Sequence, residues 1–136
     1  MIAVDTSVAV AAFGSWHEEH RSAVRAVARG ARLLGPVAVE TYAVLTRLPL
    51  PHRAPPELVV EFLTGNFPQP ILTLPPREHP RLLASCSRLG VTGGGIYDAL
   101  VAATAKHAGA TLLTLDRRAR PVYEAMGAEA RYMGSP

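Results

Sequence analysis

Short apolar runs, separated by glycine and proline, predict the strands of a buried sheet. The first run, residues 2–4, opens the chain, and the run at residues 111–115 is the most pronounced. Apolar runs of this length, bounded by turn-forming residues, are typical of buried strands. We therefore expect strands at residues 2–4, 32–34, 71–74, 111–115 and 130–132.

The segments between these runs carry apolar residues at helical spacing. In residues 36–48, for example, Val37, Thr41 and Leu45 recur every four positions and would share one face of a helix. Ser7 is placed to cap the first helix, because a hydroxyl there can accept a free backbone N–H. We expect helices at residues 8–12, 17–28, 36–48, 57–64, 80–89, 96–107 and 122–126.

The alternation of strands and helices predicts an α/β fold with a mainly parallel sheet. The only candidate linker is the proline-rich segment 49–56, which is too short to separate two domains. A chain of 136 residues also has the usual length of one domain. We therefore expect a single domain over residues 1–136.

Composition narrows the class of protein. Hydrophobic residues make up 49% of the chain and charged residues 18%, which is typical of a globular protein and not of a disordered one. Cys86 is the single cysteine, so no internal disulfide can form. No apolar run approaches the roughly 20 residues of a membrane helix, and the first residues lack the basic start of a signal peptide. We expect a cytoplasmic protein without a membrane partner.

The charge is mildly basic and is carried almost entirely by arginine. The formal net charge is +3, and Lys106 is the only lysine among 14 basic residues. Arginine makes forked contacts with phosphate, so this bias favours a nucleic-acid partner. A codon composition that favours arginine would produce the same bias, and the sequence leaves both explanations open.

The aspartates are more informative. The chain has three, Asp5, Asp98 and Asp116, and each follows or lies inside an apolar segment. Asp5 and Asp116 come directly after predicted strands, at the edge of a parallel sheet where ligands bind. Asp98 falls in the first turn of a predicted helix, where the helix dipole favours an acid. Glu40 lies in another apolar helix and would need a partner or a cation.

Four carboxylates in one place would repel one another, and their pKa values would rise unless a cation is bound. Mg²⁺ and Mn²⁺ suit such oxygen ligands, whereas one cysteine and scattered histidines do not form a zinc site. A carboxylate metal site beside a basic surface indicates phosphodiester hydrolysis by a metal-activated water. Taken singly, each acid also has an ordinary interpretation: Asp5 as a cap, Asp98 as a first-turn charge, Asp116 as a turn residue and Glu40 as a solvated helix position.

Four sequence motifs carry a family resemblance. They are Ile-Ala-Val-Asp-Thr-Ser at residues 2–7, Glu-Thr-Tyr-Ala-Val-Leu at 40–45, Ile-Tyr-Asp-Ala-Leu-Val-Ala-Ala-Thr-Ala at 96–105 and Leu-Leu-Thr-Leu-Asp-Arg-Arg at 112–118. Each is loose, but their order and separations resemble those of the PIN-domain ribonucleases. Within these, they resemble the VapC-type toxins of bacterial and archaeal toxin–antitoxin pairs.

The resemblance implies a three-layer α/β/α sandwich and an endoribonuclease that is the toxin of a type II toxin–antitoxin system. It implies Mg²⁺ or Mn²⁺, with Asp5, Asp98 and Asp116 as metal ligands and Glu40 completing the catalytic set. It also implies RNA as the substrate, a homodimer, and a cognate antitoxin that places a basic or bulky residue in the acidic pocket.

Four further residues adjoin these motifs. Thr6 is expected to hydrogen-bond a ligand carboxylate or water, and equally fits a local turn. Thr114 is expected to orient Asp116, although it also suits an ordinary strand position. Arg117 and Arg118 are expected to bind RNA phosphates or to hold the carboxylates, and a solvated surface position is the alternative.

Other classes of protein fit the sequence less well. A phosphatase with an aspartate nucleophile would need Asp-x-Asp after the first strand, but residue 7 is serine. A receiver domain would need a lysine after a later strand, and Lys106 lies inside a predicted helix. A degenerate PIN-like module that binds RNA or protein without catalysis remains the main alternative, against which the intact acids argue.

Overall fold

The computed structural model describes residues 1–135, in which three short parallel strands form the centre of the molecule. The strands are β1 (Ile2–Val4), β2 (Thr111–Thr114) and β3 (Ala130–Tyr132), in the order β1-β2-β3. Val4 pairs with Leu113, and Thr114 pairs with Tyr132. The mainly parallel sheet predicted from the sequence is confirmed.

Two predicted strands are wrong as strands, although their segments do extend the sheet. Residues 32–34 and 71–74 form only isolated parallel bridges, Ala3 to Arg32 and Leu34 to Leu72. The first segment passes directly into a helix at Gly35, and prolines lie on both sides of the second, at 70 and 75. The helix therefore ends the first segment, and the second is bounded by residues that have no N–H to donate to a longer ladder.

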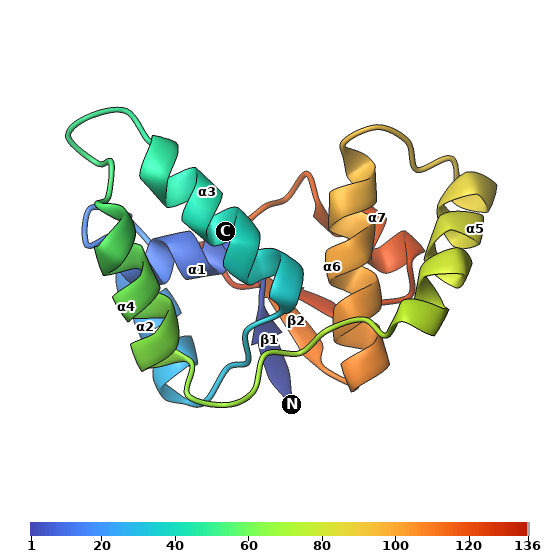
Figure 1. Ribbon diagram of the computed structural model, residues 1–136, viewed down its shortest axis with the longest axis horizontal. Coiled ribbons are helices and arrows are strands. Elements are labelled where there is room, and N and C mark those ends of the chain that lie inside the picture. The colour runs from blue at the N-terminus through green and yellow to red at the C-terminus, as the bar shows by residue number, and fades with distance from the viewer. Residues whose placement is uncertain (136) are drawn as a thin grey trace.

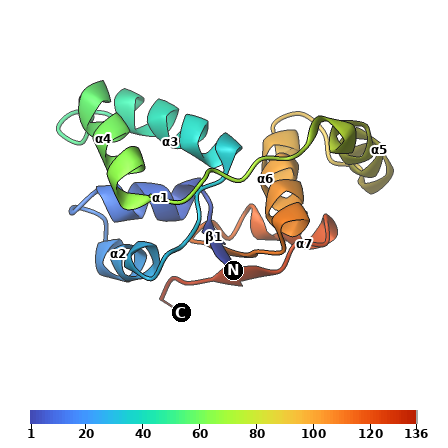
Figure 2. The ribbon, with the colours of Figure 1, turned by 60° about the horizontal axis from the view of Figure 1, so that its bottom comes forward.

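Helices cover both sides of this sheet, as Figures 1 and 2 show. One side carries α1 (Thr6–Phe13), α2 (His20–Ala28), α3 (Gly35–Arg47) and α4 (Pro56–Asn66). The other carries α5 (His79–Leu89), preceded by the short 3₁₀ helix η1 (Pro76–Glu78), then α6 (Gly95–Ala108) and α7 (Arg120–Ala125). This is the expected three-layer α/β/α arrangement.

The main core lies between the strands and helices α1, α2 and α6. Ala3 and Val4 of β1 and Leu112 of β2 are fully buried there, together with Val8 of α1 and Ala102 of α6. Alanine is frequent in this core, so the helices can approach the sheet closely. Among the residues described, no helix is both long enough and apolar enough to cross a membrane.

The start of α1 corrects one prediction about capping. Asp5, and not Ser7, is the N-cap, because its side chain accepts the backbone N–H of Val8 at 3.2 Å. The chain becomes helical immediately after β1, so the first free N–H groups lie next to Asp5 and Ser7 falls inside the first turn. The second helix also begins later than expected, at His20, because residues 15–19 form turns and bends.

Candidate functional site

The carboxyl ends of β1 and β2 bring Asp5 and Asp116 to one edge of the sheet. Asp5 follows β1 directly, and its backbone N–H donates to the carbonyl of Leu113 at 3.1 Å. Asp116 follows β2 after one intervening residue. Because β1 and β2 are parallel neighbours, the two loops that leave them meet at the same end. The topology therefore joins acids that are 111 positions apart in the chain.

Asp5 is the most constrained of the acids. It is 2% exposed, and Ser7 Oγ and Val8 N both donate to its Oδ1, while Tyr123 Oη donates to its Oδ2 at 3.0 Å. Burial raises the pKa of the Asp5 carboxyl above its ordinary value, and these hydrogen bonds act in the opposite direction. Hydrogen bonds to both oxygens hold the side chain in one orientation.

Ser7 also connects the two loops of the site. Its Oγ, which donates to Asp5, accepts the backbone N–H of Leu115 at 2.8 Å. One hydroxyl thus joins the first turn of α1 to the loop after β2. This contact positions the backbone next to Asp116 relative to Asp5.

Asp116 is held by its own loop. Its backbone N–H donates to Thr114 Oγ1 at 2.9 Å, and its Oδ1 accepts the backbone N–H of Arg118, also at 2.9 Å. The guanidinium of Arg118 lies 3.6 Å from the same oxygen. Thr114 is fully buried at the end of β2, so it anchors this turn to the sheet.

Asp98 lies close enough to the other three acids for their charges to act on it. It is in the first turn of α6 and is partly buried. Burial raises the pKa of its carboxyl, and the negative charges of Asp116, Glu40 and Asp5 raise that pKa further, while Arg118 opposes them. The other three acids chosen from the sequence therefore each lie within electrostatic reach of Asp98.

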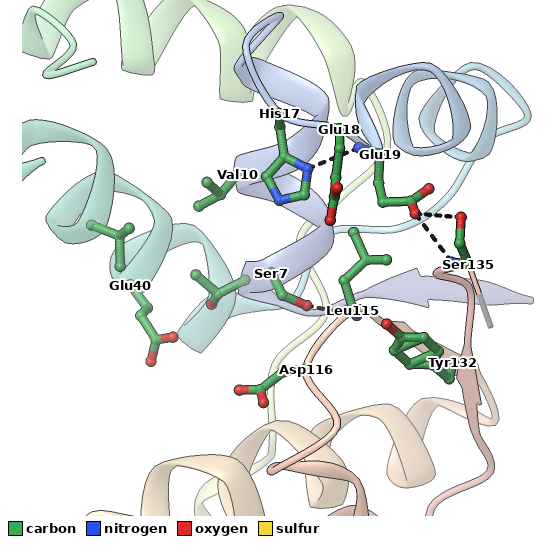
Figure 3. Close-up of a pocket in the computed structure, with 12 residues that line it drawn as sticks. Ser7, Val10, His17, Glu18, Glu19, Glu40, Leu115, Asp116, Tyr132 and Ser135 are labelled. Atoms are coloured by element: carbon green, nitrogen blue, oxygen red, sulfur yellow. Dashed lines mark hydrogen bonds between the residues drawn. The ribbon is translucent and has the colours of Figure 1, made fainter. Parts of the chain in front are cut away.

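Glu40 differs from the three aspartates. It lies on the exposed side of α3, and no hydrogen bond or ion pair holds its side chain among residues 1–135. It borders a cavity of about 640 Å³ together with Thr6, Ser7 and Asp116. Figure 3 shows Glu40 and Asp116 on adjacent walls, with Glu18 and Glu19 across the space.

The carboxylate oxygens of the four acids suit a hard divalent cation, but their side chains are not arranged around a single ion position. In the part of the chain that the structure describes, no three His, Cys, Asp or Glu side chains form a group that could hold a metal ion as they stand. Oxygen is the only ligand type the four acids offer, which is what Mg²⁺ and Mn²⁺ prefer. Burial and the neighbouring acids both raise the pKa of Asp98, and a bound cation would offset both effects.

The two arginines after Asp116 have different surroundings. Arg118 pairs with Asp116, which is one of the two roles expected from the sequence. The guanidinium carbon of Arg117 lies 4.2 Å from the centroid of the Tyr132 ring, and its Nη2 donates to the carbonyl of Ser135 at 3.2 Å. Arg117 is thus packed on the C-terminal segment beside the cavity.

Sequence reasoning missed Tyr123. This residue of α7 is 3% exposed and donates its hydroxyl to Asp5 across 118 positions. Burial and the charges of Asp5, Asp98 and Asp116 raise the pKa of its phenol, so it stays protonated and remains a donor. An isolated tyrosine in a short helix carries no motif, so nothing near it in the sequence pointed to this contact.

Comparisons with known proteins add an independent finding. Residues 2–125 match the family model of the PIN domain. Ribonuclease VapC40 of Mycobacterium tuberculosis, from strains CDC 1551 / Oshkosh and ATCC 25618 / H37Rv, is 50% identical over 129 residues, which cover 95% of this chain and 96% of that protein. Ribonuclease VapC27 of strain H37Rv is 43% identical over 129 residues, or 93% of this chain and 92% of that protein. All four carboxylates lie inside the segment that matches the family.

Proposed function

Because the chain belongs to the PIN-domain family, among its VapC-type ribonucleases, we propose that it hydrolyses RNA phosphodiester bonds at Asp5, Glu40, Asp98 and Asp116 with a divalent cation. The chain is an endoribonuclease of that family. One observation carries the choice of site: the parallel pairing of β1 with β2 brings Asp5 and Asp116 to the same edge of the sheet, and burial together with the charges of Asp116, Glu40 and Asp5 raises the pKa of Asp98 there. This convergence supports one shared site at the end of β1 and β2.

The proposed cation is Mg²⁺ or Mn²⁺, held by Asp5, Asp98 and Asp116 with Glu40 completing the set. When bound, such an ion supplies a water of lowered pKa and stabilises the negative charge that develops on the phosphate. The protein's contribution is orientation. Asp5 is fixed by three donors, and Asp116 is fixed by Arg118 and its own turn.

The remaining residues near the site have supporting roles in this proposal. Thr114 orients Asp116 by accepting its backbone N–H, and Thr6 lies on the cavity wall, where its hydroxyl can reach a bound water. Arg118 neutralises part of the acidic charge. Arg117, beside the cavity, can contact an RNA phosphate if its bond to Ser135 opens.

The biological setting follows from the family. We propose that the chain is the toxin of a type II toxin–antitoxin system and that a cognate antitoxin blocks the acidic cavity with a basic side chain. A basic residue suits this cavity because Glu18, Glu19, Glu40 and Asp116 line it. The homodimer, the single domain over residues 1–136 and the cytoplasmic location stay predictions.

The test is RNA cleavage by purified protein in EDTA, and then with Mg²⁺ or Mn²⁺ restored. We expect no cleavage in EDTA, recovery with either ion, and loss of cleavage in Asp98→Asn. The matched control is Glu61→Gln, which removes an exposed acid from α4 and should leave cleavage unchanged. Equal cleavage by wild type and Asp98→Asn would overturn the site, and RNA binding without cleavage under all conditions would identify a non-catalytic module.

A further inference from the structure

A second cavity lies near the C-terminal end of α2 and is lined by arginine. It has a volume of about 470 Å³, and Arg29, Arg32, Arg131 and Gln69 are among the residues that line it. Among the residues described, no acidic side chain lines this cavity, in contrast to the one beside Asp116. We name the cavity lined by arginine the arginine cavity, and the one beside Asp116 the carboxylate cavity.

Helix α2 carries a line of arginines that ends at this cavity. Arg21, Arg25 and Arg29 are spaced four residues apart, and all three are exposed, whereas Ala23 and Val27 form the buried face of the helix. Residues spaced by four lie on one side of a helix, about 6 Å apart along its axis. We name these three residues the α2 arginine stripe. Figure 2 shows α2 at the edge of the molecule.

The charges of the stripe and the cavity are not neutralised within the protein. Among residues 1–135, none of these five arginines forms an ion pair. Arg25 reaches only Ser22 Oγ, at 3.4 Å. Arg32 donates to the carbonyl of Pro70 at 2.6 Å, but its buried Nε has no hydrogen-bond partner. Uncompensated guanidinium groups that converge in this way favour phosphate as a ligand.

The stripe also has a defined position relative to the carboxylates. Glu19, immediately before α2, lines the carboxylate cavity, and Arg29, immediately after α2, lines the arginine cavity. Glu19 and Arg29 are ten positions apart, which corresponds to a rise of about 15 Å, the length of about four stacked nucleotides. An RNA strand cut at the carboxylate cavity can therefore lie along α2 toward the arginine cavity.

We propose that the α2 arginine stripe and the arginine cavity bind the phosphates of the RNA strand that flanks the scissile bond. This inference rests on the proposed function, since it places the substrate of that site. The contacts are to phosphate, so they add affinity without reading the sequence. The chemistry of the cut remains at the carboxylates.

The test compares Arg25→Gln/Arg29→Gln with a matched control, Arg77→Gln/Arg88→Gln, which removes two exposed charges at and near α5. RNA binding is measured in an Asp98→Asn background at several salt concentrations. The loss of two phosphate contacts should reduce the steepness of a plot of log K for RNA binding against log salt by about 1.4. A fourfold rise in salt should then reduce the RNA affinity of the parent protein about 7-fold more than that of the stripe variant. The control pair should keep the parent's slope.

Two further measurements separate anchoring from a general loss of structure. Arg25→Lys/Arg29→Lys should restore most of the slope, because lysine keeps the charge. With Asp98 intact, the Gln pair should raise KM for a long RNA and leave kcat unchanged, and it should not affect a trinucleotide too short to reach the stripe.

If the slope and KM of the stripe variant match those of the control pair while the wild type cleaves RNA, the proposed phosphate-binding role of the arginines is overturned. The proposed function is unaffected by that result. If the wild type does not cleave RNA but the stripe variant and the control pair still differ in slope, the proposed function fails. The proposal that the α2 arginine stripe and the arginine cavity bind RNA is then retained. The two proposals therefore fail separately.

Discussion

The two cavities at opposite ends of α2 differ in charge and in how their side chains are held. At the carboxylate cavity, Asp116 is fixed by its own turn, and Asp5, which is buried behind the lining residue Ser7 and does not itself line the cavity, accepts three hydrogen bonds. At the arginine cavity, Arg29 and Arg131 make no side-chain hydrogen bond within residues 1–135. Chemistry at a phosphate requires side chains in fixed positions, whereas attraction of a polyanion requires only charge. The contrast indicates one end built for reaction and one for anchoring.

The acids beside the carboxylate cavity have a free-energy cost of ionisation that the arginines do not have. Burial and the like charges of Asp116, Glu40 and Asp5 raise the pKa of Asp98, and burial raises that of Asp5, so the ionised form of each acid carries a free-energy cost. The arginines of the α2 stripe are exposed and remain hydrated. The following predictions test this difference, starting with the largest effect.

Asp5→Asn should reduce RNA cleavage by about 1000-fold, because the loss of one charged ligand removes about 4 kcal/mol of stabilisation of the transition state. The amide keeps an acceptor for Ser7 and Val8, so the fold should survive. Cleavage rates and the circular dichroism spectrum of the variant check both points. A variant that is folded and retains wild-type activity would remove Asp5 from the site.

Tyr123→Phe should weaken Mn²⁺ binding by about 10- to 100-fold, because Asp5 loses the donor that orients its Oδ2. Calorimetric titration of Mn²⁺ measures this effect directly, apart from cleavage. Tyr97→Phe is the matched control, since Tyr97 is 64% exposed at the start of α6. Equal affinities in the two variants would limit Tyr123 to packing.

Glu40→Gln should have a smaller effect on cleavage than either change above, about 10-fold, because Glu40 is exposed and nothing holds it before substrate arrives. Its melting temperature should stay within about 1 °C of the wild type, as for most surface substitutions. A loss as large as that of Asp5→Asn would show that Glu40 is a full ligand.

The smallest expected effect is that of Asp98 on the free energy of unfolding of the metal-free protein. The folded pKa of Asp98 lies above its ordinary value of 3.8, so the folded state binds more protons than the unfolded chain between the two values. Stability should therefore fall as pH rises through that window and stay lowered at pH 7.

Asp98→Asn removes this penalty and should raise the melting temperature of the metal-free protein at pH 7 by about 2 °C. The rise should shrink at low pH, where Asp98 is protonated in the wild type as well. Scanning calorimetry in EDTA at several pH values measures this, with Glu57→Gln as the control. A lower melting temperature for Asp98→Asn would contradict the sign derived from its pKa.

Much of the fold could be predicted from local patterns. The order of strands and helices follows from apolar spacing and from turn residues, and the parallel sheet follows from their alternation. The errors occurred where flanking residues cut a strand short. Residues 32–34 and 71–74 have the composition of strands, but their nearby prolines and the helix at Gly35 limit them to single bridges.

In the candidate site, too, some features could be predicted from the sequence and others could not. Asp5, Asp98 and Asp116 could be selected because they are the only aspartates and adjoin apolar segments. Their common location could only be expected, since it depends on β1 pairing with β2 more than 100 residues later. The arginine cavity had no signal at all, because its residues come from α2, the segment after it and β3.

The sequence alone specified the chemical groups: three aspartates beside buried strands or helices, a glutamate in an apolar helix, and arginine as nearly the only basic residue. These are properties of residue type and of spacing along the chain, which act locally. Tertiary structure decided which groups meet. It joined Asp5 to Tyr123 and Ser7 to the backbone of Leu115, placed the charges of three other acids near Asp98, and gathered three arginines at the far end of α2. Hydrogen bonds and Coulomb interactions act over a few ångströms in space, so they depend on contacts that only the folded chain creates.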